Sequence, residues 1–392
     1  MRPRALLAAL ALGALTGCTA TTSPGSTGDG QSAGPPPART AAAGQLDLGD
    51  PFEIAEVASF DQPWAMTFLP DGRALVTQKG GTLRLVDVGT GAAIDVAGTP
   101  QVVDAGQGGL GDVVLGPTFE RDRTVYLSWA EAGDGGVGAA VGRARLTTGD
   151  SPALEGLQVI WRQTPKVDGS GHFGHRLAFS PDGAHLFVSS GERQTMDPAQ
   201  DLTNTLGTIV RLNPDGSAAQ GNPFAGRGGV AAQIWSYGHR NPLGLAFDGA
   251  GHLWSSEMGP KGGDELNLIA AGKNYGWPKA SNGSHYSGED IPDHAPGDGL
   301  EAPKAWWNPS ISPSSLMIYS GSMFPDFTGD AFIGALSGQA LLRVHLDGTS
   351  ATKANQWDLG QRIREVEQGP DGSIWLLTDA SNGELLHLTP KA

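Results

Sequence analysis

The 392-residue sequence contains a single cysteine, Cys18, so an intrachain disulfide is excluded. Beyond residue 15, no apolar stretch is long enough to cross a bilayer as a helix. Basic residues are also few, because 26 Lys and Arg stand against 41 Asp and Glu and leave a net charge of −15. A chain this acidic is poorly suited to nucleic acid or to an anionic membrane surface, so neither is expected as a partner.

The N-terminus has the layout of an export signal. Two arginines precede an apolar run over 5–15, which is too short for a membrane-spanning helix. The run ends in Leu-Thr-Gly-Cys18, which looks like the lipobox of bacterial lipoproteins. We therefore expect a lipoprotein signal peptide over 1–17 and acylation of Cys18. The protein would be exported and lipid-anchored to the outer face of the cell membrane, with no other membrane contact. A signal peptide cleaved elsewhere, with an incidental cysteine, is the alternative.

Two regions follow the signal. Residues 18–46 are rich in Thr, Ser, Gly, Pro and Ala, which predicts a flexible tether. Residues 47–392 form the folded part, which is long for one ordinary core, so two domains or one large repeat architecture is expected. The chain has 59 glycines and no long amphipathic helical pattern, which favours short strands and many turns.

The folded part repeats one unit, an apolar strand, a turn rich in Pro, Asp and Gly, and a second apolar strand. The Asp-Gly pair is typical of a tight turn with positive φ, and alternating apolar residues indicate half-buried antiparallel strands. Six units predict an all-β fold, a six-bladed β-propeller of four-stranded antiparallel blades, with a pair of β-sandwiches as the alternative. The long interval over 248–330 predicts a functional insertion. Four units are clear, at 65–77, 177–188, 245–254 and 366–377, and two are degenerate, at 113–127 and 324–333.

Polar clusters lie just before four of these strands, over 104–109, 171–176, 237–242 and 361–364. Equivalent positions in a propeller converge near the axis, so His172, Arg240, Arg362, Arg364 and Gln107 are expected to meet. Arginine forks bind carboxylates bidentately, and two arginines two residues apart on a strand share a face. The set therefore predicts a small polyanionic ligand. His172 is a candidate base that Glu192 could orient.

Three motifs make the prediction more specific: Tyr237–Phe247, Glu257–Ile269 and Asn274–Pro278. With them the chain closely resembles the quinoprotein glucose/sorbosone dehydrogenases, from about Pro63 to Leu388. The resemblance implies oxidation of the anomeric hydroxyl of aldose sugars to lactones, by hydride transfer to pyrroloquinoline quinone (PQQ). It also implies calcium as a second cofactor, an aldose and an external electron acceptor as partners, and a monomer or weak dimer.

The resemblance assigns roles residue by residue. His172 would take the proton of the sugar hydroxyl, and Glu192 would orient it. Arg240 would lie over the quinone oxygen, Gln107 would contact both the cofactor and the substrate as part of the catalytic group, and Asn241 would contact the cofactor.

Further contacts are implied around the cofactor. Arg362 and Arg364 would bind its carboxylates, and a hydroxyl of Ser310 would face it. Four residues are implied as calcium ligands: the backbone carbonyls of Gly259 and Pro260 in the active site, and Glu265 and Tyr275 in a second, structural site.

Some positions depart from the family pattern. Ser337 stands where the glucose enzymes carry a cofactor-binding lysine, so the predicted pocket has one cation fewer. Glu192 replaces an aspartate, which preserves the charge. Two other functions share the expected fold, a cofactor-free extracellular ligand-binding propeller and a calcium-dependent lactonase. The inward arginines and His172 argue against the first, and the missing ring of acidic side chains argues against the second. A nicotinamide enzyme is not expected, because no Gly-rich turn opens a helix.

Overall fold

The computed structural model describes residues 51–391. The predicted signal peptide over 1–17, the anchor Cys18 and the tether over 18–46 therefore lie outside the described residues. Within 51–391, no helix is long and apolar enough to span a membrane.

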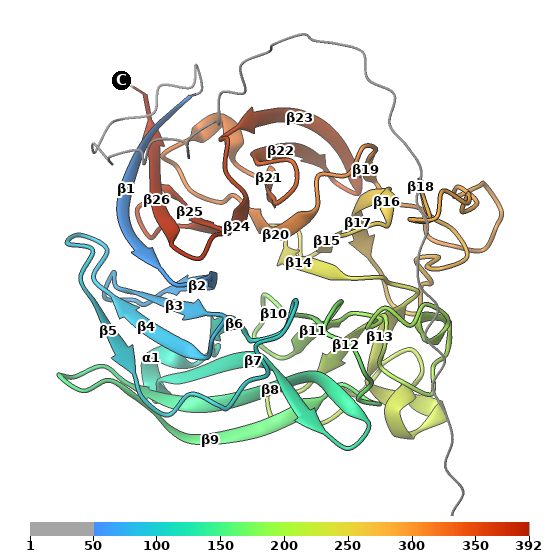
Figure 1. The fold of residues 1–392 in the computed structure, drawn as a ribbon, viewed down its shortest axis with the longest axis horizontal. Helices are drawn as coiled ribbons and strands as arrows, with labels where there is room; N and C mark the ends of the chain where they lie inside the picture. The colour runs from blue at the N-terminus through green and yellow to red at the C-terminus, as the bar shows by residue number, and fades with distance from the viewer. Residues whose placement is uncertain (1–50, 392) are drawn as a thin grey trace, which may run out of the picture. The chain divides into compact units, whose positions relative to one another are not determined.

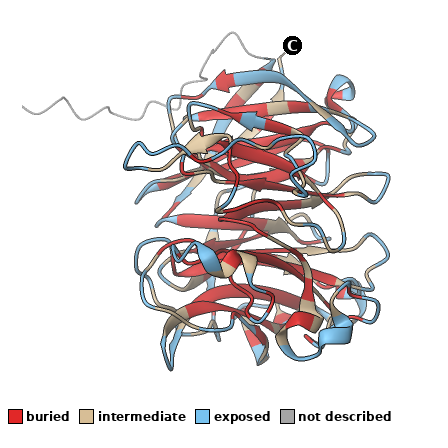
Figure 2. Cartoon of the chain, turned by 90° about the vertical axis from the view of Figure 1, so that its right-hand side faces the viewer, coloured by how far each residue is buried: buried red, intermediate tan, exposed pale blue. Residues whose placement is uncertain are grey.

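Six four-stranded antiparallel sheets are arranged around one axis, which confirms the predicted six-bladed propeller (Figure 1). Figure 2 shows that the strands are buried along most of their length, whereas exposed residues lie mainly in the connecting loops. From the axis outward, blades 1 to 3 consist of β2 (Pro63–Phe68), β3 (Ala74–Gln78), β4 (Thr82–Val86) and β5 (Ala93–Val96); β6 (Leu110–Leu115), β7 (Thr124–Gly133), β8 (Gly136–Thr147) and β9 (Ala153–Arg162); and β10 (Gly174–Phe179), β11 (Leu186–Ser190), β12 (Thr208–Leu212) and β13 (Ile234–Tyr237).

Blades 4 to 6 follow the same order. They consist of β14 (Pro242–Phe247), β15 (Leu253–Glu257), β17 (Asp264–Ile269) and β19 (Ala305–Trp307); β20 (Pro313–Ile318), β21 (Ala331–Ala335), β22 (Ala340–Asp347) and β23 (Ser350–Asp358); and β24 (Ile363–Gln368), β25 (Ile374–Thr378), β26 (Gly383–Pro390) and β1 (Phe52–Phe60). A small sheet pairs β16 (Lys261–Gly262) with β18 (Gly283–Ser284). Helical turns are short: α1 (Phe119–Asp122), η1 (Asp197–Gln200), η2 (Ala225–Arg227), η3 (Gly229–Gln233) and η4 (Pro325–Phe327).

The predicted repeats are the two inner strands of each blade, and five of them match their strands. The sixth, over 324–333, was placed too late, because its first strand is β20 (Pro313–Ile318). The segment around Phe324 is the connection between β20 and β21 and contains η4. An aromatic-rich connection there resembles a strand in composition. The predicted insertion lies mainly between β17 and β19, and it carries β18.

Two ends of the chain close the ring. β1, the first strand, pairs with β26, the last strand, from Phe52 opposite Pro390 to Phe60 opposite Gly383. Figure 1 shows the blue β1 beside the red β26. Phe52 is 1% exposed and its ring lies 4.9 Å from that of Trp357, so β1 also packs against blade 5. Closure leaves the ring without an unpaired seam.

A single buried arginine links all six inner strands. Arg176 lies on β10 and is 5% exposed. Its partners come from the other five strands: Glu365 of β24 at 2.5 Å, Asp112 of β6 at 3.4 Å, the carbonyl of Leu243 of β14 at 2.7 Å, the carbonyl of Ser314 of β20 at 2.9 Å, and the ring of Trp64 of β2 at 4.2 Å.

Burial raises the pKa values of the carboxyl groups around this arginine. Burial raises the pKa of Glu365 to about 7, against the charge of Arg176, and Asp112 adds to the rise. The pKa of Asp112 is also raised by burial, which outweighs the attraction of Arg176. Because these folded-state pKa values lie above the unfolded ones, their contribution to stability is present at low pH. It is lost as the pH rises toward 7.

We predict that Arg176→Met lowers the free energy of unfolding by about 3–5 kcal/mol at pH 8, because it leaves buried carboxylates unpaired. The loss should be smaller at pH 5, where the Glu365 carboxyl is protonated and needs no counter-charge. Urea unfolding at pH 8 and at pH 5 measures the two losses of free energy. Arg145→Met is the control, since Arg145 pairs with Glu155 in an exposed position, and its effect should stay within about 0.5 kcal/mol. Equal losses of Arg176→Met at both pH values would contradict the electrostatic explanation.

Candidate active site

The loops that precede the inner strands gather at one end of the axis, because all six inner strands start from that end. Three of these loops carry predicted site residues: β5–β6 carries Gln107, β9–β10 carries His172, and β13–β14 carries Arg240 and Asn241. Glu192 reaches the same place from the end of β11. The structure therefore brings these five residues to one end of the axis, as expected from the convergence of equivalent loops.

His172 and Glu192 form a buried pair. The ring Nδ1 of His172 is hydrogen bonded to Glu192 Oε1, and the two residues are 5% and 1% exposed. The other oxygen of Glu192 accepts from the backbone N–H of Met196. A carboxylate on Nδ1 fixes the tautomer with the proton on that nitrogen, so Nε2 keeps its lone pair and can accept a proton.

The charge state of this pair follows from burial and from its neighbours. Burial lowers the pKa of His172, and the charges of Arg240 and Arg193 act in the same direction, whereas Glu192 raises it. Burial tends to raise the pKa of Glu192, but its interactions with His172 and Met196 outweigh this and hold the pKa below the usual value. At neutral pH the pair is therefore a neutral imidazole beside a carboxylate.

Gln107 and Asn241 hold the loop of His172 in place. The Oε1 atom of Gln107 accepts from the backbone N–H of His172 at 2.7 Å, and Asn241 Nδ2 approaches the same oxygen at 3.5 Å. Asn241 Oδ1 accepts from the N–H of Gly174 at 3.1 Å. Gln107 is exposed and Asn241 is fully buried, so the backbone of this loop is held from the surface and from the interior.

Arg240 is a buried cation without a carboxylate partner. It is 5% exposed, and among residues 51–391 no carboxylate oxygen lies within 4 Å of its guanidinium. Its Nη1 donates to the carbonyls of Met258 and Gly259, at 3.1 and 2.7 Å, and Nη2 donates to the hydroxyl of Tyr286 at 3.2 Å. Its Nε is buried with no hydrogen-bond partner. An unpaired buried guanidinium is suited to an anionic ligand.

Glu257 fixes the backbone of Arg240, a role that sequence reasoning missed. Its carboxylate accepts from the N–H of Arg240 at 2.6 Å and from His239 Nδ1 at 2.9 Å. His239 is fully buried, bonded to Ser236 and stacked on Tyr275, so it is structural. The motif that contains Glu257 was recognised, but no local pattern connects the end of β15 with the loop before β14.

Arg362 and Arg364, which are predicted to bind the cofactor carboxylates, both contact one carboxylate of this chain. Arg362 Nε and Arg364 Nε both donate to Asp379, at 2.7 and 2.9 Å. Burial tends to raise the pKa of Asp379, but the two arginines outweigh it and lower the pKa. Within residues 51–391, no hydrogen bond joins this group to His172. Asp379 follows β25, and no sequence motif pointed to its role.

Ser310 is held by a buried carboxylate. Its hydroxyl donates to the buried carboxylate of Asp264 at 2.6 Å, which also accepts the backbone N–H groups of Ile311, Ser312 and Gly259. Asp264 therefore ties the loop before β20 to the loop after β15. Ser337 lies nearby, with its hydroxyl 2.8 Å from that of Ser312.

Three of the four predicted calcium ligands, Gly259, Glu265 and Tyr275, line one small cavity of about 10 Å³. Glu257 also lines it, whereas Pro260 does not. Burial and then the charge of Glu257 raise the pKa of Glu265 well above its usual value. The hydroxyl of Tyr275 is engaged with the β17 backbone, since it donates to the carbonyl of Leu268 at 2.6 Å. Within the described part of the chain, no cluster of three His, Cys, Asp or Glu side chains is arranged for a metal.

Strained backbone is concentrated in these loops. Among residues 51–391, nine non-glycine residues have positive φ, and most belong to the site or its supports: His172, His175, Arg193, Gln194, Met196 and Ser312. Such residues persist only where surrounding contacts hold them, and they are frequent at functional sites. Composition does not report φ, so the sequence could not reveal them.

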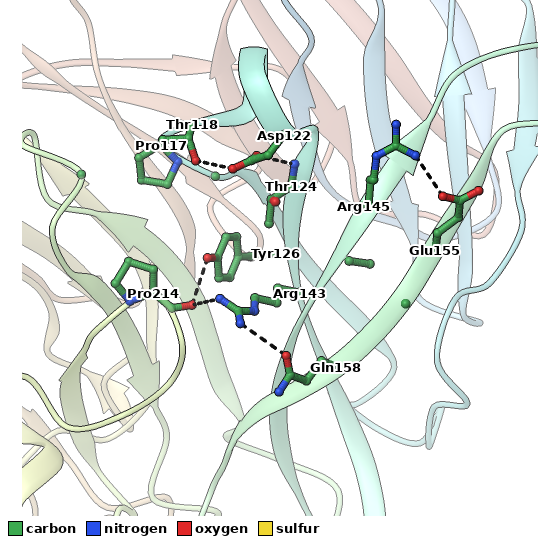
Figure 3. A pocket seen from close by; sticks show the side chains of 14 residues that line it. Pro117, Thr118, Asp122, Thr124, Tyr126, Arg143, Arg145, Glu155, Gln158 and Pro214 are labelled. Atoms are coloured by element: carbon green, nitrogen blue, oxygen red, sulfur yellow. Dashed lines mark hydrogen bonds and ion pairs between the residues drawn. The ribbon is translucent and has the colours of Figure 1, made fainter.

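A larger cavity, of about 370 Å³, lies away from this site, between blade 2 and the turns of blade 3 (Figure 3). Its polar groups are paired with one another: Arg145 with Glu155, Arg143 with Gln158 and the Pro214 carbonyl, and Thr118 with Asp122. It holds neither a base nor an unpaired charge of the kind found at Arg240, so we place the chemistry at the His172 site.

Comparisons with known proteins place the chain in one family. The family model described as Glucose / Sorbosone dehydrogenase matches residues 60–387. The aldose sugar dehydrogenase YliI of Escherichia coli (strain K12) is 43% identical over 339 residues, which are 84% of this chain and 91% of that protein.

Solved structures are similar over the same range. The apo-form soluble aldose sugar dehydrogenase from Escherichia coli superposes with a TM-score of 0.82 at 42% identity, over 87% of this chain and 100% of that chain. The PQQ-bound form of the aldose sugar dehydrogenase from Streptomyces coelicolor superposes with a TM-score of 0.73 at 29% identity, over 87% and 98%.

We predict that Gly191→Ala disrupts the site. A Cβ at this position would overlap the carbonyl of His172 and lie 3.0 Å from Asn241 Oδ1, so the backbone must move. Overpacking of this kind costs about 1–3 kcal/mol. Thermal unfolding measures the cost, and the NMR signals of the His172 ring report the displacement. Gly249→Ala is the control, because its Cβ would meet nothing within 4 Å. Unchanged ring signals in Gly191→Ala would show that the packing around His172 is looser than described.

Proposed function

The chain belongs to the glucose/sorbosone dehydrogenase family, and on that basis we propose that it is a PQQ-dependent aldose sugar dehydrogenase. It oxidises the anomeric hydroxyl of aldoses to lactones. One observation carries this function. A neutral His172, held by Glu192, and the cation of Arg240, which has no carboxylate partner, lie in the same buried site.

The residues of the site fit an anionic quinone. PQQ carries carboxylates, and Arg240 offers a buried guanidinium whose Nε has no partner. Arg362 and Arg364 lie at the same end of the axis and supply further cations for carboxylates, with Asp379 as their resident counter-ion. Gln107 and Asn241 would add amide contacts. Ser310 is held by Asp264, so its contact would come from the loop rather than from a free hydroxyl.

The chain's own residues supply the proton transfer. When bound, PQQ provides the carbon that accepts a hydride from the anomeric carbon. The proton of the sugar hydroxyl passes to Nε2 of His172, while Glu192 stabilises the imidazolium that forms. Arg240 would hold the cofactor and would stabilise negative charge that the cofactor gains.

Calcium is proposed as a second cofactor at two places. At the first, the Gly259 carbonyl already accepts from Arg240, which disfavours a divalent cation on that atom while the guanidinium remains there. Gly259 and Pro260 therefore fit calcium only if Arg240 turns toward the anionic ligand. At the second, the buried carboxylates of Glu257 and Glu265 repel each other, and a cation held by Glu265 and Tyr275 would relieve this.

Reconstitution tests the proposal directly. Purified protein titrated with PQQ and calcium should reduce a redox dye when aldoses are added, and chelation of calcium should weaken cofactor binding. Cofactor binding with no turnover across a panel of aldoses would instead favour a ligand-binding propeller.

We predict that His172→Ala lowers the rate of cofactor reduction by at least about 100-fold and leaves cofactor affinity nearly unchanged, the usual scale for loss of a general base. Arg364→Ala should lower cofactor affinity by about 10- to 150-fold, because a charge-assisted contact is lost. Stopped-flow reduction and cofactor titration separate the two effects. Losses of rate and affinity in equal proportion in both variants would refute this division of roles.

The pH dependence should follow the same base. Activity requires neutral His172, whose pKa lies below its usual value of 6.5, mainly because of burial. The midpoint of the acid limb of kcat/KM should therefore lie below pH 6.5. An acid limb above that pH would identify a different base.

We further propose that the protein is an exported lipoprotein that passes electrons to an external acceptor. The support is the lipobox-like segment that ends in the only cysteine. Cys18→Ala should release the protein from the membrane fraction without altering its catalytic constants. Membrane fractionation with salt washing checks this, and a variant that stays bound would refute the lipid anchor.

A further inference from the structure

Arg193 follows Glu192 directly and is 1% exposed. Its guanidinium donates to two backbone carbonyls of the loop that carries His172, those of Gly171 and of Gly169 at 2.7 Å, and to the carbonyl of Val137 of β8 at 3.3 Å. Its own N–H donates to the carbonyl of His172 at 3.2 Å. One side chain therefore connects the loop that carries the base with β8 and with the end of β11.

The charge of Arg193 is not neutralised by an ion pair. Across the described residues, no carboxylate oxygen lies within 4 Å of its guanidinium, which instead lies over the ring of Phe173 at 3.7 Å. Its Nε is buried with no partner. Burial lowers the pKa of Arg193 to about 10, with Glu192 opposing the change, so the side chain is still a cation at neutral pH. A purely structural clamp would not need an unpaired buried charge, since neutral donors could serve.

The segments that Arg193 connects are conformationally strained. His172 has φ of 50°, and Arg193 and Gln194 have φ of 60° and 61°. Gly171 leaves room for this arrangement, because a Cβ there would lie 2.5 Å from Gln194 Oε1. Contacts such as those of the guanidinium fork are what keep such conformations populated.

We propose that Arg193 is a positioning residue for the proton acceptor: its fork holds the 169–173 loop so that His172 faces the site, and its unpaired charge opposes protonation of the imidazole. The inference rests on the proposed function, because it takes His172 as the base.

The charges that face His172 come from three groups: Glu192 and Arg193 after β11, and Arg240 before β14. The carboxylate favours the imidazolium, and the two cations oppose it. When the Arg193 charge is removed, one of the two cations that disfavour the imidazolium is lost and Glu192 still favours it. The pKa of His172 should therefore rise.

The test uses Arg193→Met, which removes both the charge and the fork, and Arg193→Lys, which keeps the charge but loses the fork. Arg211→Met is the matched control, because Arg211 also stacks on an aromatic ring, Trp235 at 4.2 Å, but belongs to β12 and lies outside the site. The readout is the NMR pH titration of the His172 ring in full-length, cofactor-free protein, together with amide exchange over 169–173.

Arg193→Met should raise the titration midpoint of His172 by at least about 0.5 pH units, the scale of one partly screened charge. Arg193→Lys should keep a midpoint close to wild type but lose at least about tenfold of the amide protection of the loop. An unchanged midpoint in Arg193→Met, or full loop protection in Arg193→Lys, would overturn the proposal. If Arg193→Met does not fold, the protection of Arg193→Lys still decides the positioning role.

In the PQQ-loaded enzyme, the acid limb of kcat/KM should move to higher pH in Arg193→Met and stay in place in Arg211→Met. This result separates two failures. If His172→Ala oxidises sugars normally, the proposed base is wrong, whereas the titration of His172 in the cofactor-free protein still tests Arg193. If the midpoint does not move while His172→Ala is inactive, only the inference about Arg193 fails.

Discussion

The fold depends on one guanidinium at its axis. Six blades packed around a ring each present an inner strand to the centre, and Arg176 contacts every one of the other five. Charged and carbonyl oxygens meet it from different blades, so the arginine fixes how the blades stand relative to one another. The site loops begin where these same inner strands begin, and their relative placement follows from the packing of the axis.

At one end of this axis, the site consists of loops whose conformations are fixed by hydrogen bonds. Glu192 holds the ring of His172, Glu257 holds the backbone of Arg240, and Asp264 holds the loop of Ser310. Each of these supports is a buried carboxylate that receives several donors. Such preorganisation keeps the reacting groups in place before any ligand arrives, which is what electrostatic catalysis requires.

Much of this could be predicted from the sequence. Strand alternation and Asp-Gly turns are local signals, so the six blades and five of their inner hairpins were found. His172, Glu192, Arg240, Gln107 and Asn241 meet because equivalent loops of a propeller converge. Asp379, Glu257 and Arg193 were missed as supports, because their partners lie on other loops or strands and depend on distances that no local pattern encodes. The repeat at 324–333 was misplaced because aromatic residues there fill a connection.

The pairing of β1 with β26 sets the order in which the fold can form. Among the described residues, the strand that completes blade 6 comes before all the others in the sequence, and its partner β26 comes after them. Blades 1 to 5 can each assemble from neighbouring segments, whereas blade 6 joins segments more than 300 residues apart. Contacts of such large sequence separation slow folding, so the closure of the ring is expected to follow the formation of the other blades.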